Sequence, residues 1–291
     1  KPNRALTPEA CKRASKDADK ALPRGAVVSE RFEVARNFAN KLWNASRFAL
    51  MNLEGYTAGA VAENDLTLED RWVLSRLNTV TRQVTEALES FRFSEASRAL
   101  YDFAWDEFCS FYIEMAKPRL QDPAQRTHAQ RLLAHALDTL LRLLHPLMPF
   151  ITEEMWQNLS KIAPSRGLTP QPASEFIITA PWPTAELSHQ DRKIEQQFAI
   201  FQQTLGAIRE IRNRQNISMK SELEFYVQCS AATAELLQPM TAYFQSMANA
   251  RAVAWSETIT PPATHAKTSL GGIDIFVDLK DFIDVPAEIA K

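Results

Sequence analysis

The chain has 291 residues, and its content of 45% hydrophobic and 23% charged residues is that of an ordinary globular protein. Glycine is scarce, at 7 residues, whereas a typical protein has about 7% glycine, and this disfavours folds built on glycine-rich nucleotide-binding loops. The formal net charge of −2 argues against a globally basic nucleic-acid-binding protein, and no apolar run approaches the ~18 residues of a membrane span.

Residues 1–28 have a net charge of +4 and few apolar side chains. We predict that they form a lead-in from a preceding domain; the alternative is a basic arm that contacts a phosphate backbone. The first residues include neither an initiator methionine nor the apolar core of a signal peptide. We therefore expect the sequence to be a piece of a longer chain.

A helix is predicted over residues 29–53, with Ser29 as its N-cap. The apolar stripe of this helix, expected to be core, comprises Ala35, Phe38, Ala39, Leu42, Ala45 and Ala49. A second face holds Arg36, Asn40, Trp43 and Arg47, and a flank of the helix holds Lys41 and Phe48. A helix whose core stripe is bordered by basic, amide and aromatic side chains is not a plain solvated surface.

These side chains are of the types that bind RNA. Lysine and arginine contact phosphates, amides and arginines also read base edges, and Phe48 or Trp43 could stack on an unpaired base. The alternative interpretation is a solvated helix whose two aromatic residues belong to the core. The sequence pattern alone leaves both open.

Four further helices are predicted in the same bundle. Thr67, followed by Asp70, gives a capping-box start to a helix that ends near Ser90. An aromatic helix should begin at Ser94 and stop near Lys117, because Pro118 disfavours helix before it. The other two helices are predicted over residues 123–144 and 152–159. The bundle as a whole spans residues 29–162.

Residues 163–186, rich in proline and serine, are predicted to be a linker, and residues 187–291 a small α/β module. Within this module, helices are expected over residues 190–215 and 231–248, and a strand over residues 222–229. Short strands are expected over residues 251–255, 267–270 and 273–279, with Gly271 and Gly272 as a hairpin turn. A last helix should begin at about Asp284.

No feature predicts catalysis by this chain. Nucleotide-binding loops and nucleophile motifs are absent from the sequence, and the three cysteines and five histidines form no ligand pairs. Unpaired cysteines are typical of a reducing compartment such as the cytoplasm. Glu153 and Glu154 lie in the first turn of a helix, where acids favour the helix dipole. Cys109 is expected to fill the core. We predict no catalytic residue and no metal site.

The segment ARNFANKLWNASRF, at residues 35–48, resembles the anticodon-binding helix of the valyl-tRNA synthetase family. Further similar segments follow in the same order: LMN (50–52), DRWVLS (70–75), FRF (91–93), WDEFC (105–109), AKP (116–118), HPLMPFITEEMW (145–156), APWP (180–183), AIREIR (207–212), GGI (271–273) and DFID (281–284). The resemblance covers about residues 29–286, and the block at residues 35–48 is the most specific to this family.

The resemblance implies a mainly α fold, an anticodon-binding helix bundle followed by a small α/β module. It places Lys41, Arg47 and Phe48 at the anticodon, with Arg31 and Ile113 as weaker correspondences. Arg36 is expected to make an intramolecular contact or a phosphate contact, and Asn40 is a candidate phosphate contact. Trp43 is expected to pack rather than to stack on a base. The family's catalytic domain, editing domain and coiled-coil arm have no counterpart in this sequence, so the chain alone should be inactive.

The family joins valine to tRNA(Val) with ATP and magnesium in the cytoplasm, so the resemblance implies tRNA(Val) as the partner, without DNA or membrane. It also implies intramolecular contacts with the catalytic domain and the coiled-coil arm. Valine codons require adenine in the middle of the anticodon and cytosine at its end. Two alternatives are the anticodon-binding part of the isoleucyl enzyme and a helical scaffold that docks partner proteins.

Overall fold

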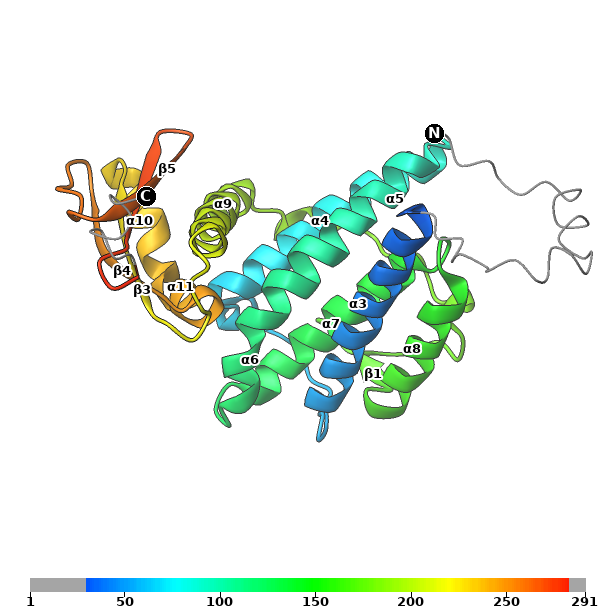
Figure 1. The fold of residues 1–291 in the computed structure, drawn as a ribbon. Coiled ribbons are helices and arrows are strands. Elements are labelled where there is room, and N and C mark those ends of the chain that lie inside the picture. Colours follow the sequence, from blue (N-terminus) through cyan, green and yellow to red (C-terminus); the bar gives the residue numbers. More distant parts are fainter. Residues whose placement is uncertain (1–29, 283–291) are drawn as a thin grey trace, which may run out of the picture.

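The computed structural model describes residues 30–282, and Figure 1 shows a helical bundle beside a smaller unit with a sheet. The lead-in at residues 1–28, the predicted N-cap Ser29 and the helix predicted from Asp284 lie outside the described residues. The bundle consists of α3 (Glu30–Asn52), α4 (Leu68–Glu89), α5 (Phe93–Asp102), a π-helix (Phe103–Tyr112), α6 (Ile113–Gln121), α7 (Arg126–Leu144) and α8 (Pro149–Ile162). The predicted fold class is confirmed.

The buried stripe of α3 agrees with the sequence pattern over most of its length. Phe38, Leu42 and Ala49 are buried, and Leu53 just after the helix continues the stripe. The prediction that Ala35 belongs to the core is wrong, because Ala35 is exposed. It lines a groove with Leu147, Met148 and other residues, between the start of α3, α5 and the turn that joins α7 to α8.

The capping box of α4 is confirmed, since the Thr67 and Asp70 side chains and backbone amides bond reciprocally. The aromatic helix differs from its prediction at both ends. It starts at Phe93, with Arg92 as N-cap, and it continues through Pro118 to Gln121. Pro118 lies in the last turns, where Arg119 and Leu120 are buried, and this tertiary packing outweighs the local cost of the proline.

The segment predicted as a linker lies against the bundle. It contains two short paired strands, β1 (Ser165–Arg166) and β2 (Gln171–Pro172). The Trp182 indole donates to Thr85 Oγ1 at 2.8 Å, and the Trp156 indole on α8 donates to the Ser174 carbonyl at 2.9 Å. These contacts fasten the segment to α4 and α8.

The smaller unit begins with α9 (Arg192–Arg214), whose N-cap Asp191 accepts bonds from the amides of Lys193 and Ile194. Its sheet has the order β4-β3-β6-β5, with β3 and β4 parallel and the other pairs antiparallel. The strands are β3 (Leu223–Gln228), β4 (Ala250–Ser256), β5 (His265–Leu270) and β6 (Ile273–Asp278). Gly271 and Gly272 both have positive φ, as the predicted hairpin turn requires.

The helix predicted over residues 231–248 is broken into two, α10 (Ala231–Leu237) and α11 (Thr241–Ala248). A short 3-10 turn at Gln238–Met240 separates them, because Pro239 cannot donate the bond that would continue α10. The buried Arg212 side chain ties the end of α9 to this unit, donating to the carbonyls of Ser218, Ser221, Ala248 and Asn249.

The bundle and the smaller unit share one continuous core, and α9 lies between them (Figure 1). The ring of Trp72 on α4 stacks on that of Phe198 on α9, with centroids 4.5 Å apart and planes inclined by 7°. The Tyr243 hydroxyl on α11 donates to Glu69 at 2.7 Å. The second unit is therefore held in a defined position on α4.

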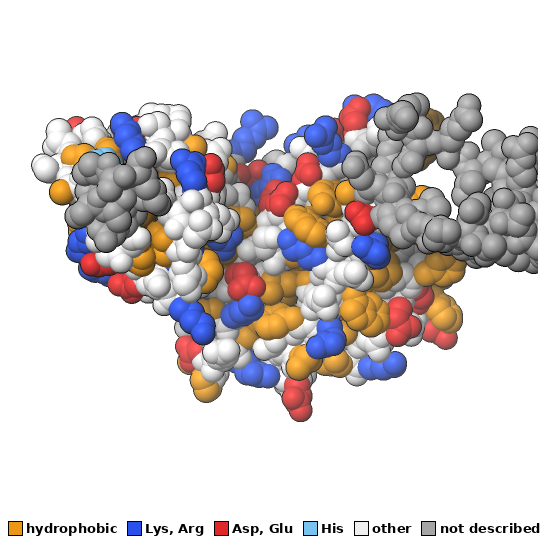
Figure 2. All heavy atoms as spheres, viewed as in Figure 1, with side chains coloured by type: hydrophobic (Ala, Val, Ile, Leu, Met, Phe, Trp, Pro, Cys, Tyr) orange, Lys and Arg blue, Asp and Glu red, His pale blue; other side chains and the backbone are white. Residues whose placement is uncertain are grey.

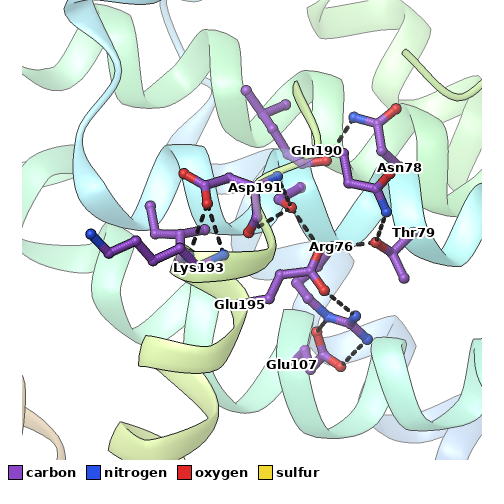
Figure 3. A network of polar contacts seen from close by, with 11 residues as sticks. Arg76, Asn78, Thr79, Glu107, Gln190, Asp191, Lys193 and Glu195 are labelled. Carbon is purple, nitrogen blue, oxygen red and sulfur yellow. Dashed lines mark hydrogen bonds and ion pairs between the residues drawn. The ribbon is translucent and has the colours of Figure 1, made fainter. Parts of the chain in front are cut away.

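A polar network strengthens the same junction (Figure 3). The Arg76 guanidinium bonds to both Glu107 oxygens, at 2.6 and 2.8 Å, and to Glu195 at 3.0 Å. Ser75 and Thr79 donate to the second Glu195 oxygen, at 2.6 and 2.9 Å. Both carboxylates thus have partners, and the network joins α4, the π-helix and α9.

Candidate nucleic-acid interface

One face of α3 carries the polar and aromatic residues expected to bind RNA. The four members of the predicted second face, Arg36, Asn40, Trp43 and Arg47, are all exposed. Trp43, which was expected to pack, is 42% exposed, and this is high for so large an apolar ring. Figure 1 shows that α3 runs along the outside of the bundle, and Figure 2 shows lysine and arginine side chains interspersed with apolar ones over that side.

Lys41 lies on the flank of α3, where that helix packs against the π-helix. Its ammonium donates to Ser110 Oγ at 2.7 Å and lies 4.0 Å from the centroid of the Trp105 ring. Partial burial lowers the pKa of Lys41, opposed by the nearby Cys109 and Asp106. This lysine is held in a fixed position rather than extended into solvent.

Phe48 is half-buried further along the same flank. The Lys117 ammonium, from α6, lies 5.5 Å from the centroid of the Phe48 ring. Lys117 also bonds to both oxygens of Glu114, at 2.6 and 2.7 Å. Phe48 therefore combines an aromatic ring with an adjacent cation, which suits contact with a base and its phosphate.

The remaining predicted residues differ in their surroundings. Arg47 is exposed on α3. The backbone of Arg31 belongs to the first turn of α3. Ile113 is only 4% exposed and lies in the core. The contact of Ile113 with RNA stays a prediction.

Sequence reasoning missed Trp105, Ser110 and Lys117. These residues lie on the aromatic helix, but they meet α3 because that helix and α3 run side by side. The aromatic composition of residues 101–112 was the available signal. It could not locate the contacts, since the π-helix changes which residues share a face.

Cys109 and Glu153 carry groups that are often catalytic in enzymes, but here both side chains have structural roles. Burial raises the pKa of the Cys109 thiol to about 12, which keeps it protonated and unreactive near neutral pH. The Glu153 carboxylate accepts bonds from the Gln157 side chain and the Ile177 amide, at 2.7 and 3.1 Å. Over residues 30–282 there is no cluster of three potential metal ligands, and no helix is long and apolar enough to cross a membrane.

Comparison with known families places this helical bundle among the anticodon-binding domains. The family described as "Anticodon-binding domain of tRNA ligase" matches residues 70–227, which is more than half of the chain. The chain belongs to this family. The match begins within α4, so the similarity of α3 depends on individual relatives.

Those relatives are valine--tRNA ligases, which confirms the resemblance drawn from the sequence. The protein of Rhodopirellula baltica is 53% identical and covers 100% of this chain. Those of Carboxydothermus hydrogenoformans and Thermosynechococcus vestitus are 41% and 37% identical and cover 89% and 96% of it. The chain spans only 29%, 28% and 30% of these three relatives, respectively.

Proposed function

We propose that this chain recognises the anticodon of tRNA(Val) as one part of a valine–tRNA ligase. The complete enzyme would join valine to the tRNA with ATP and magnesium in the cytoplasm, and this chain would supply none of the reacting groups. Its role would be to bind the anticodon so that a catalytic domain elsewhere in the protein receives the acceptor end. Contacts with that domain and with a coiled-coil arm belong to the same proposal.

The observation that supports this most is the arrangement along α3. Arg36, Asn40, Trp43 and Arg47 are exposed on one face, while Lys41 and Phe48 lie on the adjoining flank against the π-helix and α6. Cationic groups would bind the phosphates of the loop, and the Phe48 ring would stack on a splayed base. An interface of this size needs only a local basic patch, which is compatible with the net charge of −2.

The test is a binding titration of the 291-residue chain with a valine tRNA transcript, repeated at several salt concentrations. We expect steeply salt-dependent binding, weakened when the middle adenine or the last cytosine of the anticodon is replaced. Phe48→Ala and Arg47→Ala should each cost on the order of 1–3 kcal/mol of binding free energy.

Matched controls are available at exposed positions on helices other than α3. Arg214→Ala removes an exposed arginine of α9, and Phe150→Ala removes a ring that is 90% exposed on α8. Both should leave the affinity for the valine transcript unchanged. Tighter binding of an isoleucine tRNA transcript would favour the isoleucyl family instead, and unchanged binding in Phe48→Ala and Arg47→Ala would favour a protein-docking scaffold.

A further inference from the structure

We propose that Trp105 and Ser110 are positioning residues that hold the Lys41 ammonium in place for its contact with RNA. This inference depends on the proposed function, and it extends that function to two residues of a different helix. The two residues lie on the π-helix Phe103–Tyr112, opposite Lys41 on α3.

The hydrogen bonds at Ser110 have a fixed direction. Its hydroxyl donates its only proton to the Trp105 carbonyl, at 2.7 Å. The Ser110 oxygen therefore presents a lone pair to the Lys41 ammonium, which donates to it at 2.7 Å. An ammonium has three donors, so the bond to Ser110 leaves donors available to an RNA acceptor.

The Trp105 ring supplies a second hold on the same ammonium, 4.0 Å from the ring centroid. The ring is itself held in place by other aromatic residues. It stacks on Tyr101 with centroids 5.7 Å apart and planes inclined by 7°, and Tyr101 stacks on Phe38 of α3 at 5.1 Å. Lys41 thus rests on the end of an ordered aromatic stack.

The π-helix is what brings these groups together. In an α-helix, residues three and four apart are neighbours, whereas Ser110 and Trp105 are five apart in the chain. The Ile113 amide likewise donates to the carbonyl of Phe108, which is the hydrogen bond of a π-helix. The wider turn places the Ser110 hydroxyl on the Trp105 carbonyl, and π-helical turns frequently occur at functional sites.

Holding the lysine has a consequence for binding. A free lysine side chain on a helix surface loses rotamer freedom when it contacts a ligand, and that loss opposes binding. Trp105 and Ser110 impose much of this order before the RNA arrives. Their contribution to affinity should therefore require the Lys41 ammonium, and this dependence separates a positioning role from a direct contact or a general packing role.

A double-mutant cycle measures this dependence. The variants are Trp105→Leu, Trp105→Phe, Ser110→Ala and Lys41→Met in the 291-residue chain, and the probe is the valine tRNA transcript. We expect Trp105→Leu to weaken binding about fivefold, whereas Trp105→Phe, which keeps an aromatic face, should weaken it less than about twofold. In the Lys41→Met background, Trp105→Leu and Ser110→Ala should each change the affinity less than about twofold.

The control is Trp182→Leu, which alters a half-buried tryptophan bonded to Thr85, away from α3. It should lower the unfolding midpoint and leave RNA affinity unchanged. If Trp105→Leu fails to fold, Ser110→Ala alone completes the cycle, because it removes only a hydroxyl group.

Equal losses for Trp105→Leu or Ser110→Ala with and without Lys41 would overturn the inference. A Lys41→Met variant that binds as tightly as the unchanged chain would also overturn it, while a loss in Phe48→Ala would still support anticodon binding. If the unchanged chain does not bind the valine transcript in preference to its anticodon variants, the proposed function fails, and this inference fails with it.

Discussion

The Lys117 ammonium on α6 lies 5.5 Å from the centroid of the Phe48 ring on α3, and the Glu114 carboxylate holds the same ammonium at 2.6 Å. One end of the candidate interface is therefore a ring, a cation and an acid, contributed by two helices. Glu114 competes with any phosphate for the lysine, but both side chains are more than a third exposed. Such a pair is weak in water and easily exchanged.

We expect Glu114→Gln to strengthen RNA binding and Lys117→Met to weaken it, each about threefold, because the first releases the cation and the second removes it. The unfolding free energy should change by less than about 1 kcal/mol in both variants, as is usual for exposed ion pairs. Titration with the valine tRNA transcript checks the affinities. A change in the same direction for both variants would show that the pair acts only through the fold.

The hydrogen bonds of Arg76 predict that a substitution at this residue lowers the stability of the fold and leaves the RNA affinity unchanged. Arg76→Lys keeps the charge but cannot bond to both Glu107 oxygens and to Glu195 at once. We expect a loss of about 1–3 kcal/mol of unfolding free energy, measured by urea denaturation.

Arg82→Lys, on the same helix, is the matched control. The Arg82–Glu86 pair is exposed and has one contact of 3.5 Å, so this variant should change stability by less than about 0.5 kcal/mol. Equal effects of the two substitutions would show that the fork geometry at Arg76 is unimportant.

The Asp70 carboxylate predicts that the folded state loses stability over a defined range of low pH. Burial by itself would raise the pKa of this carboxyl, but contacts with His128 and Arg119 outweigh burial and lower its pKa to about 2 from 3.8. A carboxyl with a lowered pKa stabilises the folded state above pH 3.8, and this stabilisation is lost as the pH falls to about 2. The loss should amount to about 2 kcal/mol.

Asp70→Asn should be less stable at neutral pH, and its difference from the unchanged chain should narrow as the pH is lowered through this range. Urea unfolding at several pH values measures both. Asp102→Asn, at an exposed position of α5, should follow the unchanged chain throughout. A difference at Asp70→Asn that is independent of pH would contradict the assignment.

The His135 side chain predicts that the folded state also loses stability over a second, higher range of pH. This side chain lines a cavity between α4, α7 and the segment around Trp182, and burial lowers its pKa to about 4 from 6.5. The unfolded chain then binds a proton that the folded chain excludes, so stability falls as the pH drops from 6.5 to about 4. The loss is up to about 3 kcal/mol.

His135→Gln should reduce the pH dependence between these values. His265→Gln, at an exposed position of β5, is the control and should retain it. If both variants keep the full pH dependence of the unchanged chain, another group is responsible for it.

Local patterns predicted the elements and much of the candidate interface. The helical period of α3 correctly separated Phe38, Leu42 and Ala49 from the exposed Arg36 and Arg47, because burial on a helix follows that period. Capping and turn chemistry placed the start of α4 and the hairpin between β5 and β6, since these depend on neighbouring residues only.

Features that depend on distant residues escaped prediction. The helix continues past Pro118 because Arg119 is buried and bonds to Asp70 through two hydrogen bonds, at 2.8 and 2.9 Å. Residues far apart in the sequence make these contacts, so no local rule reports them. The same holds for Trp105 and Ser110, whose meeting with Lys41 depends on a π-helix and on the packing of two helices.

The stack of Trp72 on Phe198 gives the molecule an internal optical reporter. Trp72 is only 1% exposed, and its partner ring belongs to α9, so its indole is shielded by the junction itself. In a variant that keeps Trp72 and replaces the other five of the six tryptophans, separation of the sheet-containing unit from the bundle would admit water to that indole and shift its fluorescence to longer wavelength. Time-resolved emission could then distinguish a molecule that opens at this junction from one that unfolds in a single step.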